Sequence, residues 1–147
     1  MIMDIVNVLA ILFSPLIAIL VTVYLQDRKE KRGHKLSILG SLIGTRHAQL
    51  TDENVRSLNM IDMIFFDEPR VRTLWHEYFD MLCNEGLNNA GGWTQRSKKR
   101  LELITEMAKS LGYEKAITHL DVDRVYIPEY FGKSFQRSEA IANELLV

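Results

Sequence analysis

The side chains that could do chemistry are scattered along this 147-residue chain and form no known catalytic pattern. The only cysteine, Cys83, stands among apolar residues, so we expect a buried thiol rather than a nucleophile. His119, Asp121 and Asp123 come nearest to a metal-ligand spacing, but no further ligands accompany them. Zinc spacings, a Walker loop, a dinucleotide-binding glycine motif and a GxSxG elbow are all missing. The sequence therefore predicts a protein that is not an enzyme and that holds no cofactor and no metal.

A basic cluster offers a different chemistry, the binding of anions. A loop rich in glycine and asparagine covers residues 85–93, and a helix is expected to begin at Trp93 or Thr94. The first turns of that helix contain four cations: Arg96, Lys98, Lys99 and Arg100. Cations at a helix N-terminus oppose the helix dipole, but free backbone N–H groups, positive charge and Trp93 together suit phosphates and a stacked base. The alternative is an ordinary solvated basic face.

The longest pattern in the sequence is an uncharged run from Ile5 to Leu25. As a helix it would be about 31 Å long, close to the roughly 30 Å hydrocarbon core of a bilayer. A cluster of four cations follows it and suits lipid headgroups: Arg28, Lys29, Lys31 and Arg32. The run is therefore interpreted as a single membrane-spanning helix. The positive-inside rule then places the N-terminus outside and the C-terminal part in the cytoplasm.

Three other interpretations of this run remain open. A cleaved signal peptide would need a basic start and a small-residue cleavage site, neither of which is present. A buried helix of a soluble domain is rarely free of charge over such a length. The third alternative is a spanning helix that serves only as an anchor.

Small and polar residues gather on one face of the expected membrane helix. At about 100° per residue, Asn7, Ala10, Ser14, Ala18 and Thr22 fall within an arc of about 120°. In lipid, such a face permits close approach and hydrogen bonds between helices. It therefore predicts homo-oligomerisation, with a tetramer as the working stoichiometry, through an interface or pore formed by Asn7, Ser14, Pro15, Ala18 and Thr22. Pro15 removes one helical hydrogen bond and is expected to kink the helix, as a hinge or as a tolerated irregularity.

The remaining apolar spacing is helical, which predicts an all-α fold. We expect a transmembrane segment over residues 1–26 and a cytoplasmic domain of about four to five helices over residues 27–147. Thr51 and Asp67 are expected to cap helices that run to about residues 66 and 83, and Gly112 to end the basic helix. An aromatic stripe on the second of these helices predicts core positions: Val71, Leu74, Trp75, Tyr78, Phe79 and Leu82. An extended piece near Pro128 and a last helix from Ser134 or Ser138 complete the expected order.

Charge is unevenly distributed, although the formal net charge is only −1. That balance gives no global reason to expect nucleic-acid binding. Residues 26–50 and 94–115 are basic, whereas residues 51–85 are strongly acidic. Such segregation suits oligomer contacts or an anionic ligand, and it is also common on solvated helices.

Five segments of the chain carry a resemblance: MDIVNVLAILFSPLIA, the DRKEKR collar, RSLNMIDMIFF, VRTLWHEYFDML and RVYIPEYFG. The chain resembles a family of small bacterial and phage-associated proteins of unknown function with an N-terminal membrane segment. Its architecture is also similar to the membrane effector of the Hailong anti-phage defence system. That resemblance implies a homo-oligomeric channel in the bacterial inner membrane, an oligonucleotide ligand that keeps it closed, and a nucleotidyltransferase partner. It places no ligand-binding residue in this chain.

Two hypotheses follow. In the first, the protein is an inner-membrane effector that forms or gates a pore and depolarises the cell, controlled by a nucleotide on its cytoplasmic domain. In the second, it is a passive scaffold or adaptor that recruits a cytoplasmic partner through the acidic helices of residues 51–85.

Overall fold

The computed structural model describes residues 2–46 and 51–115 together with residues 122, 124, 126 and 128; within the first helix, the side chains of residues 2, 4–10 and 12 are not described. The described part is all-α, as expected. Its elements are α1 (Ile2–Gly44), α2 (Asp52–Asn59), α3 (Ile61–Ile64), α4 (Pro69–Cys83), the short 3₁₀ helix η1 (Glu85–Leu87) and α5 (Ala90–Ser110). The expected extended piece and last helix lie largely outside the described residues.

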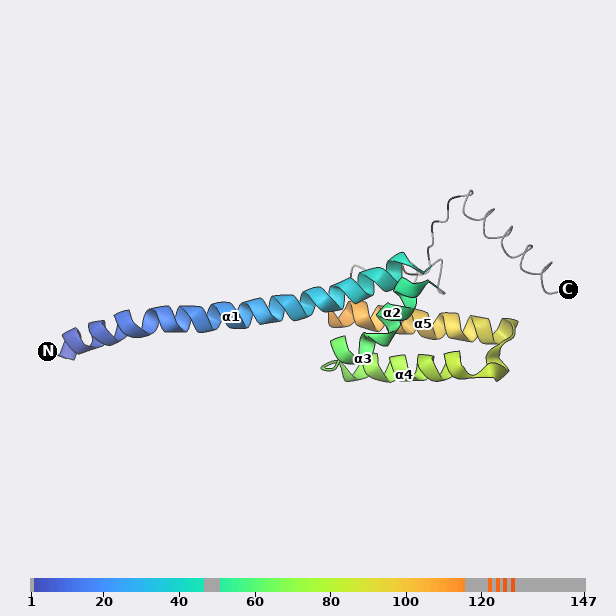
Figure 1. The fold of residues 1–147 in the computed structure, drawn as a ribbon, viewed down its shortest axis with the longest axis horizontal. Helices are drawn as coiled ribbons and strands as arrows, with labels where there is room; N and C mark the ends of the chain where they lie inside the picture. Colours follow the sequence, from blue (N-terminus) through green and yellow to red (C-terminus); the bar gives the residue numbers. More distant parts are fainter. Residues whose placement is uncertain are drawn as a thin grey trace.

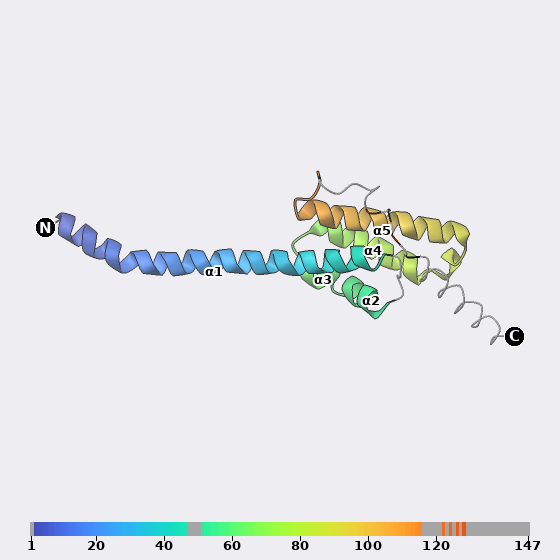
Figure 2. The same cartoon turned by 90° about the horizontal axis from the view of Figure 1, so that it is seen from above.

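Helix α1 is a single rod of 43 residues, about 63 Å long. The other helices pack against its C-terminal part only, so the N-terminal half extends away from the bundle (Figure 1). The expected boundary at residue 26 therefore falls inside a continuous helix. Pro15 lies within α1, and the helix bends in its N-terminal third (Figure 2).

The core forms where α1 meets the antiparallel pair α4 and α5, with α2 and α3 alongside (Figures 1 and 2). Leu39 and Leu42 from α1 are 2% and 0% exposed. They join residues that the aromatic stripe predicted, such as Trp75 and Tyr78, and residues of α5 such as Ile104. The C-terminal part of α1 is thus a full member of the bundle rather than a connector.

A polar seam joins α1 to α2. Ser57 donates to the Ser41 hydroxyl at 2.8 Å, and Ser41 donates to Glu53 at 2.9 Å. The buried Asn54 amide donates to the Thr45 hydroxyl at 2.7 Å. Because buried polar groups require partners, this seam fixes how α2 lies along the end of α1.

Two helix ends follow the sequence rules closely. Thr51 caps α2 as predicted, since its hydroxyl accepts from the backbone N–H of Asn54. Gly112 stops α5 as predicted, with φ of 82°. The Tyr113 N–H donates to the Ala108 carbonyl and the Gly112 N–H to the Lys109 carbonyl, both at 2.9 Å. These are the two hydrogen bonds of a Schellman motif, whose left-handed residue is usually glycine.

The expected single helix over residues 51–66 is wrong, because the chain breaks at Met60 into α2 and α3. The Met60 N–H is shared between the carbonyls of Arg56 and Ser57, and the change of direction carries Ile61 and Phe65 into the core, each 0% exposed. Burial of these two side chains outweighs continuation of the helix.

The capping role expected for Asp67 is also wrong. Glu68 occupies the N-cap of α4 without a side-chain hydrogen bond, and Pro69 takes the first helical turn as expected. Asp67 instead binds the Lys35 ammonium at 2.6 Å. An ion pair with a nearly buried lysine is the stronger attraction for this carboxylate.

Three expected core side chains lie at the surface. Phe79 is 47% and Leu82 39% exposed, and Cys83 is exposed rather than buried. They lie in the last two turns of α4. A stripe at helical spacing therefore marks the buried face without giving its length.

We predict that Leu42→Ala lowers the free energy of unfolding by about 2–5 kcal/mol, because Leu42 is fully buried and a cavity would remain. Leu36→Ala on the same helix is the matched control: Leu36 is 41% exposed, and the expected loss is under about 1 kcal/mol. Denaturant unfolding of the full chain followed by circular dichroism measures both. Equal losses would mean that the end of α1 does not belong to the core.

Candidate functional site

The N-terminal half of α1 exposes its apolar side chains in every direction. Ten large apolar residues from Ile11 to Leu25 are between 51% and 74% exposed: Ile11, Phe13, Leu16, Ile17, Ile19, Leu20, Val21, Val23, Tyr24 and Leu25. At about 100° per residue they cover the whole circumference of the helix. Among the residues that the structure describes, no helix is long and apolar enough to cross a membrane.

The predicted small-residue face lies on this half of α1. Ser14, Pro15, Ala18 and Thr22 are all exposed. The Thr22 hydroxyl donates to the Ala18 carbonyl at 2.7 Å, so it is satisfied within its own helix. Asn7 also lies on α1, but its side chain is outside the described part. The described members share one face, and their role in an interface or pore stays a prediction.

The predicted collar begins three residues beyond Leu25. Arg28, Lys29, Lys31 and Arg32 are exposed. Lys31 pairs with Asp27 at 2.7 Å, which raises the pKa of its ammonium. The guanidinium of Arg28 lies 5.8 Å from the centre of the Tyr24 ring, and that of Arg32 lies 5.7 Å from the centre of the Tyr113 ring. Arg32 thereby brings the collar against the chain that follows α5.

A groove of about 570 Å³ runs along the collar. Its lining comes from three parts of the bundle: α1, the turn before α4, and the end of α5. The lining residues are Leu25, Arg28, Lys29, Lys31, Arg32, Lys35, Asp67, Glu68, Ser110 and Leu111. Five of them are cations and two are carboxylates. The sequence marks these cations as a collar, but the contribution of Ser110 and Leu111 depends on tertiary packing and carries no local signal.

Lys35 lines this groove and is only 7% exposed. Its ammonium binds Asp67 at 2.6 Å and Glu68 at 2.9 Å, and it lies 5.6 Å from the centre of the Phe65 ring. Burial lowers the pKa of Lys35, but the hydrogen bonds with the two carboxylates outweigh burial and raise it. Burial likewise raises the pKa of Asp67, and the hydrogen bond from Lys35 more than reverses this. Both groups therefore stay charged near neutral pH.

The predicted anion site on the basic helix looks different in three dimensions. Helix α5 begins at Ala90, not at Trp93 or Thr94, because the Asn89 side chain caps it by accepting from the Gly92 N–H at 2.9 Å. Gly92 is required there: a Cβ would lie 2.0 Å from the Leu87 carbonyl oxygen. The four cations therefore lie in the second and third turns, away from the free N–H groups of the helix start.

Arg96 is buried and binds the carbonyl groups at the C-terminal end of α4. Its guanidinium donates to the carbonyls of Met81 at 2.9 Å and Asn84 at 3.0 Å, and to the Asn88 side chain at 3.1 Å. These carbonyls belong to a helix C-terminus, which attracts cations. The exposed Trp93 ring lies over the same guanidinium, 5.2 Å from ring centre to carbon.

The other three cations of the basic helix are separated from one another. Arg100 is buried and donates to the Leu42 carbonyl of α1 at 3.1 Å. Lys99 binds Glu77 at 3.0 Å and Glu102 at 2.8 Å, whereas Lys98 is exposed. The structure thus does not bring the predicted anion-binding residues to one surface, and their binding role stays a prediction.

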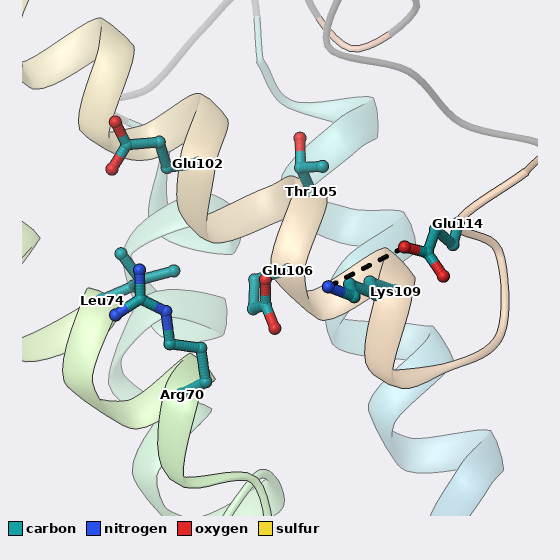
Figure 3. Close-up of a pocket in the computed structure, with 7 residues that line it drawn as sticks. All are labelled: Arg70, Leu74, Glu102, Thr105, Glu106, Lys109 and Glu114. Carbon is teal, nitrogen blue, oxygen red and sulfur yellow. Dashed lines mark ion pairs between the residues drawn. The ribbon is translucent and has the colours of Figure 1, made fainter.

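A second hollow, of about 350 Å³, lies between α4 and α5 (Figure 3). It is lined by Arg70 and Leu74 of α4 and by Glu102, Thr105, Glu106 and Lys109 of α5. Lys109 pairs with Glu114 at 3.8 Å. The mixture of cations and carboxylates leaves little net charge, and no group of three metal-ligating side chains occurs among the described residues. His119, Asp121 and Asp123 lie outside that part.

One family model matches the chain over residues 1–147, and its description is "Family of unknown function (DUF6680)". The chain belongs to the DUF6680 family. This confirms the expected membership of a family of unknown function. The matched residues include both α1 and the bundle. Searches of curated proteins and of solved structures gave no match.

We predict that stability falls below about pH 4 through Asp67. Because the folded-state pKa of Asp67 lies below its ordinary value of 3.8, its contribution is present above that value and is lost as pH falls through the lower pKa. Urea unfolding of the full chain between pH 7 and pH 2 measures this slope. In Lys35→Gln the pKa of Asp67 should rise and this part of the slope should shrink. An unchanged slope would mean that the pair does not contribute.

We predict that Arg96→Lys lowers the free energy of unfolding by about 1.5–3 kcal/mol, because a lysine cannot reach the same carbonyls with a planar fork. Lys98→Gln, two residues away and exposed, should change it by less than about 0.5 kcal/mol. Thermal unfolding of the full chain measures both. A fully stable Arg96→Lys variant would show that Arg96 does not hold the end of α4.

Proposed function

We propose that this protein is a homo-oligomeric membrane effector. In this proposal the apolar half of α1 lies in the bacterial inner membrane, with the N-terminus outside and the bundle in the cytoplasm. The observation that carries it is the ring of exposed apolar side chains between Ile11 and Leu25. A helix that is apolar all round belongs in a core or in lipid, whereas a coiled-coil partner would cover only one stripe.

The energetic argument favours lipid over water. Removing one large apolar side chain from water stabilises by about 1.5–3 kcal/mol, and ten such residues line this half of α1. Even with each side chain about half covered already, the sum exceeds the total stability of many small domains. The run of Ile5–Leu25, to which the undescribed side chains also belong, supplies the length that a bilayer requires.

Oligomerisation through the small-residue face is the next part of the proposal. Ser14, Ala18 and Thr22 are spaced four residues apart and therefore lie along one side of α1. In lipid this is the side on which helices approach most closely. The resemblance to the Hailong effector supports a pore formed by the helices that meet along this side. The pore would open in anti-phage defence and be controlled by an oligonucleotide from a partner nucleotidyltransferase. Passive anchoring of a scaffold is the alternative outcome of the test.

We predict that a single cysteine at position 14 or 18 forms intermolecular disulfides in membranes. The exposed Cys83 would crosslink on its own, so the background is Cys83→Ser. Ser14→Cys and Ala18→Cys should crosslink, whereas Leu16→Cys and Leu20→Cys, on the opposite side of the helix, should not. Non-reducing gels of oxidised membranes measure this. Equal crosslinking on both sides, or none at positions 14 and 18, would contradict the interface.

The same preparations test conduction. The Cys83→Ser protein in planar bilayers should carry ion currents, and Ser14→Leu together with Ala18→Leu should abolish them while leaving the protein resistant to carbonate extraction. Protein that crosslinks but never conducts, with or without oligonucleotides, would instead be a passive scaffold. Protein released by carbonate would overturn the membrane placement itself.

A further inference from the structure

The groove along the collar combines features that do not occur together elsewhere in the described bundle. Arg28, Lys29 and Arg32 lie on one wall, and within the described residues no carboxylate pairs with them. The two acids of the groove, Asp67 and Glu68, are both held by Lys35, which follows these cations on the same helix. Lys35 balances one of these two negative charges, and the lining as a whole keeps an excess of positive charge, with five cations against two carboxylates.

The position of the groove matches the depth of lipid headgroups. Leu25, the last residue of the uncharged run, forms one end of it. Arg28 to Arg32 follow three to seven residues later, which is about 5–10 Å along a helix. Each headgroup layer of a bilayer is roughly 5–8 Å thick. If the apolar run lies in the hydrocarbon, these cations therefore lie among phosphates.

Aromatic contacts hold the two arginines ready for such a ligand. Arg28 lies over Tyr24, a residue type that is enriched at membrane interfaces, and Arg32 lies over Tyr113 beyond the end of α5. Stacking uses the face of a guanidinium, whereas phosphate binds the N–H groups in its plane. The contacts therefore orient both side chains without consuming the donors.

Because it is built from three parts of the chain, the groove is more than a basic stretch of helix. The end of α5 and the turn before α4 form the end of the bundle that faces the N-terminal half of α1 (Figure 1). Ser110 and Leu111 close the groove on the α5 side. An anion bound there would touch α1 and the bundle together.

We propose that this groove binds the phosphate of an anionic phospholipid from the cytoplasmic leaflet. This rests on the proposed membrane placement of α1. The phosphate contacts Arg28, Lys29 and Arg32, and Lys35 with its two acids lies beside this site. Binding fixes the bundle against the membrane surface instead of leaving it free at the end of a rod. A soluble phosphate offers the same chemistry, so the test separates the two sources.

The experiment is native mass spectrometry of the full chain released from detergent, titrated with phosphatidylglycerol, with phosphatidylcholine and with inorganic phosphate. The wild-type protein should retain phosphatidylglycerol over phosphatidylcholine. Each basic residue near a membrane surface changes affinity about fivefold. The triple variant Arg28→Gln, Lys29→Gln, Arg32→Gln should therefore bind phosphatidylglycerol about 100-fold more weakly.

The matched control is Arg56→Gln, Arg70→Gln, Lys115→Gln, which removes the same charge from exposed positions outside the groove. It should bind phosphatidylglycerol as the wild type does. Equal loss in both triple variants would overturn the groove, since net charge alone would then explain binding. Equal retention of phosphatidylcholine, or competition by millimolar inorganic phosphate, would overturn the lipid as ligand.

Carbonate extraction of both variants tests membrane insertion independently of phosphatidylglycerol binding. A triple variant that stays integral but loses phosphatidylglycerol supports the groove. Release of all proteins by carbonate would refute the proposed function itself, together with the inference that depends on it.

Discussion

The structure depends on one constraint: a single helix serves two environments without a break. Leu39 and Leu42 of α1 are buried in the bundle, while the side chains between Ile11 and Leu25 are exposed on all sides of the same rod. Lys35 stands between the two regions and is nearly buried against Asp67 and Glu68. Removing a buried cation from its partners is strongly unfavourable. The ion pairs therefore secure the point at which the bundle meets the free part of α1.

The arginines of α5 show how a charge pattern can serve structure. Arg96 satisfies the carbonyls at the end of α4, and Arg100 reaches a carbonyl of α1. Both act on backbone groups that would otherwise need water at a buried position. Burial also raises the pKa of Tyr78 beside them, although the two arginines act in the opposite direction. Cations that look misplaced on a helical wheel can thus be the means by which helices are joined.

Local rules predicted the parts of the fold that local chemistry determines. Apolar spacing gave the all-α class and the span of α4, and the Thr51 cap and the Gly112 stop follow from their own side chains. The break at Met60 and the partner of Asp67 did not follow, because the first is set by burial of Ile61 and Phe65 and the second by Lys35, which is distant in sequence. The start of α5 has a local cause, the Asn89 cap, within a stretch that was predicted to be a loop. The same holds for the candidate site. The collar cations are visible in the sequence, whereas the groove requires the end of α5, which lies some eighty residues away.

Because α1 is continuous, it fixes the angle between the side that packs in the bundle and the side that carries the small residues. Counted at 100° per residue, Lys35, Leu39 and Leu42 point roughly a quarter turn away from Ser14, Ala18 and Thr22. Consider an oligomer in which the α1 helices meet along these small residues around a central axis. Each bundle would then lie to the side of its own helix, pointing neither toward the central axis nor directly away from it. Adjacent bundles would then follow one another around the axis, each in the same rotational sense. The rotational sense of such an arrangement would be set by the angle between the two faces of α1.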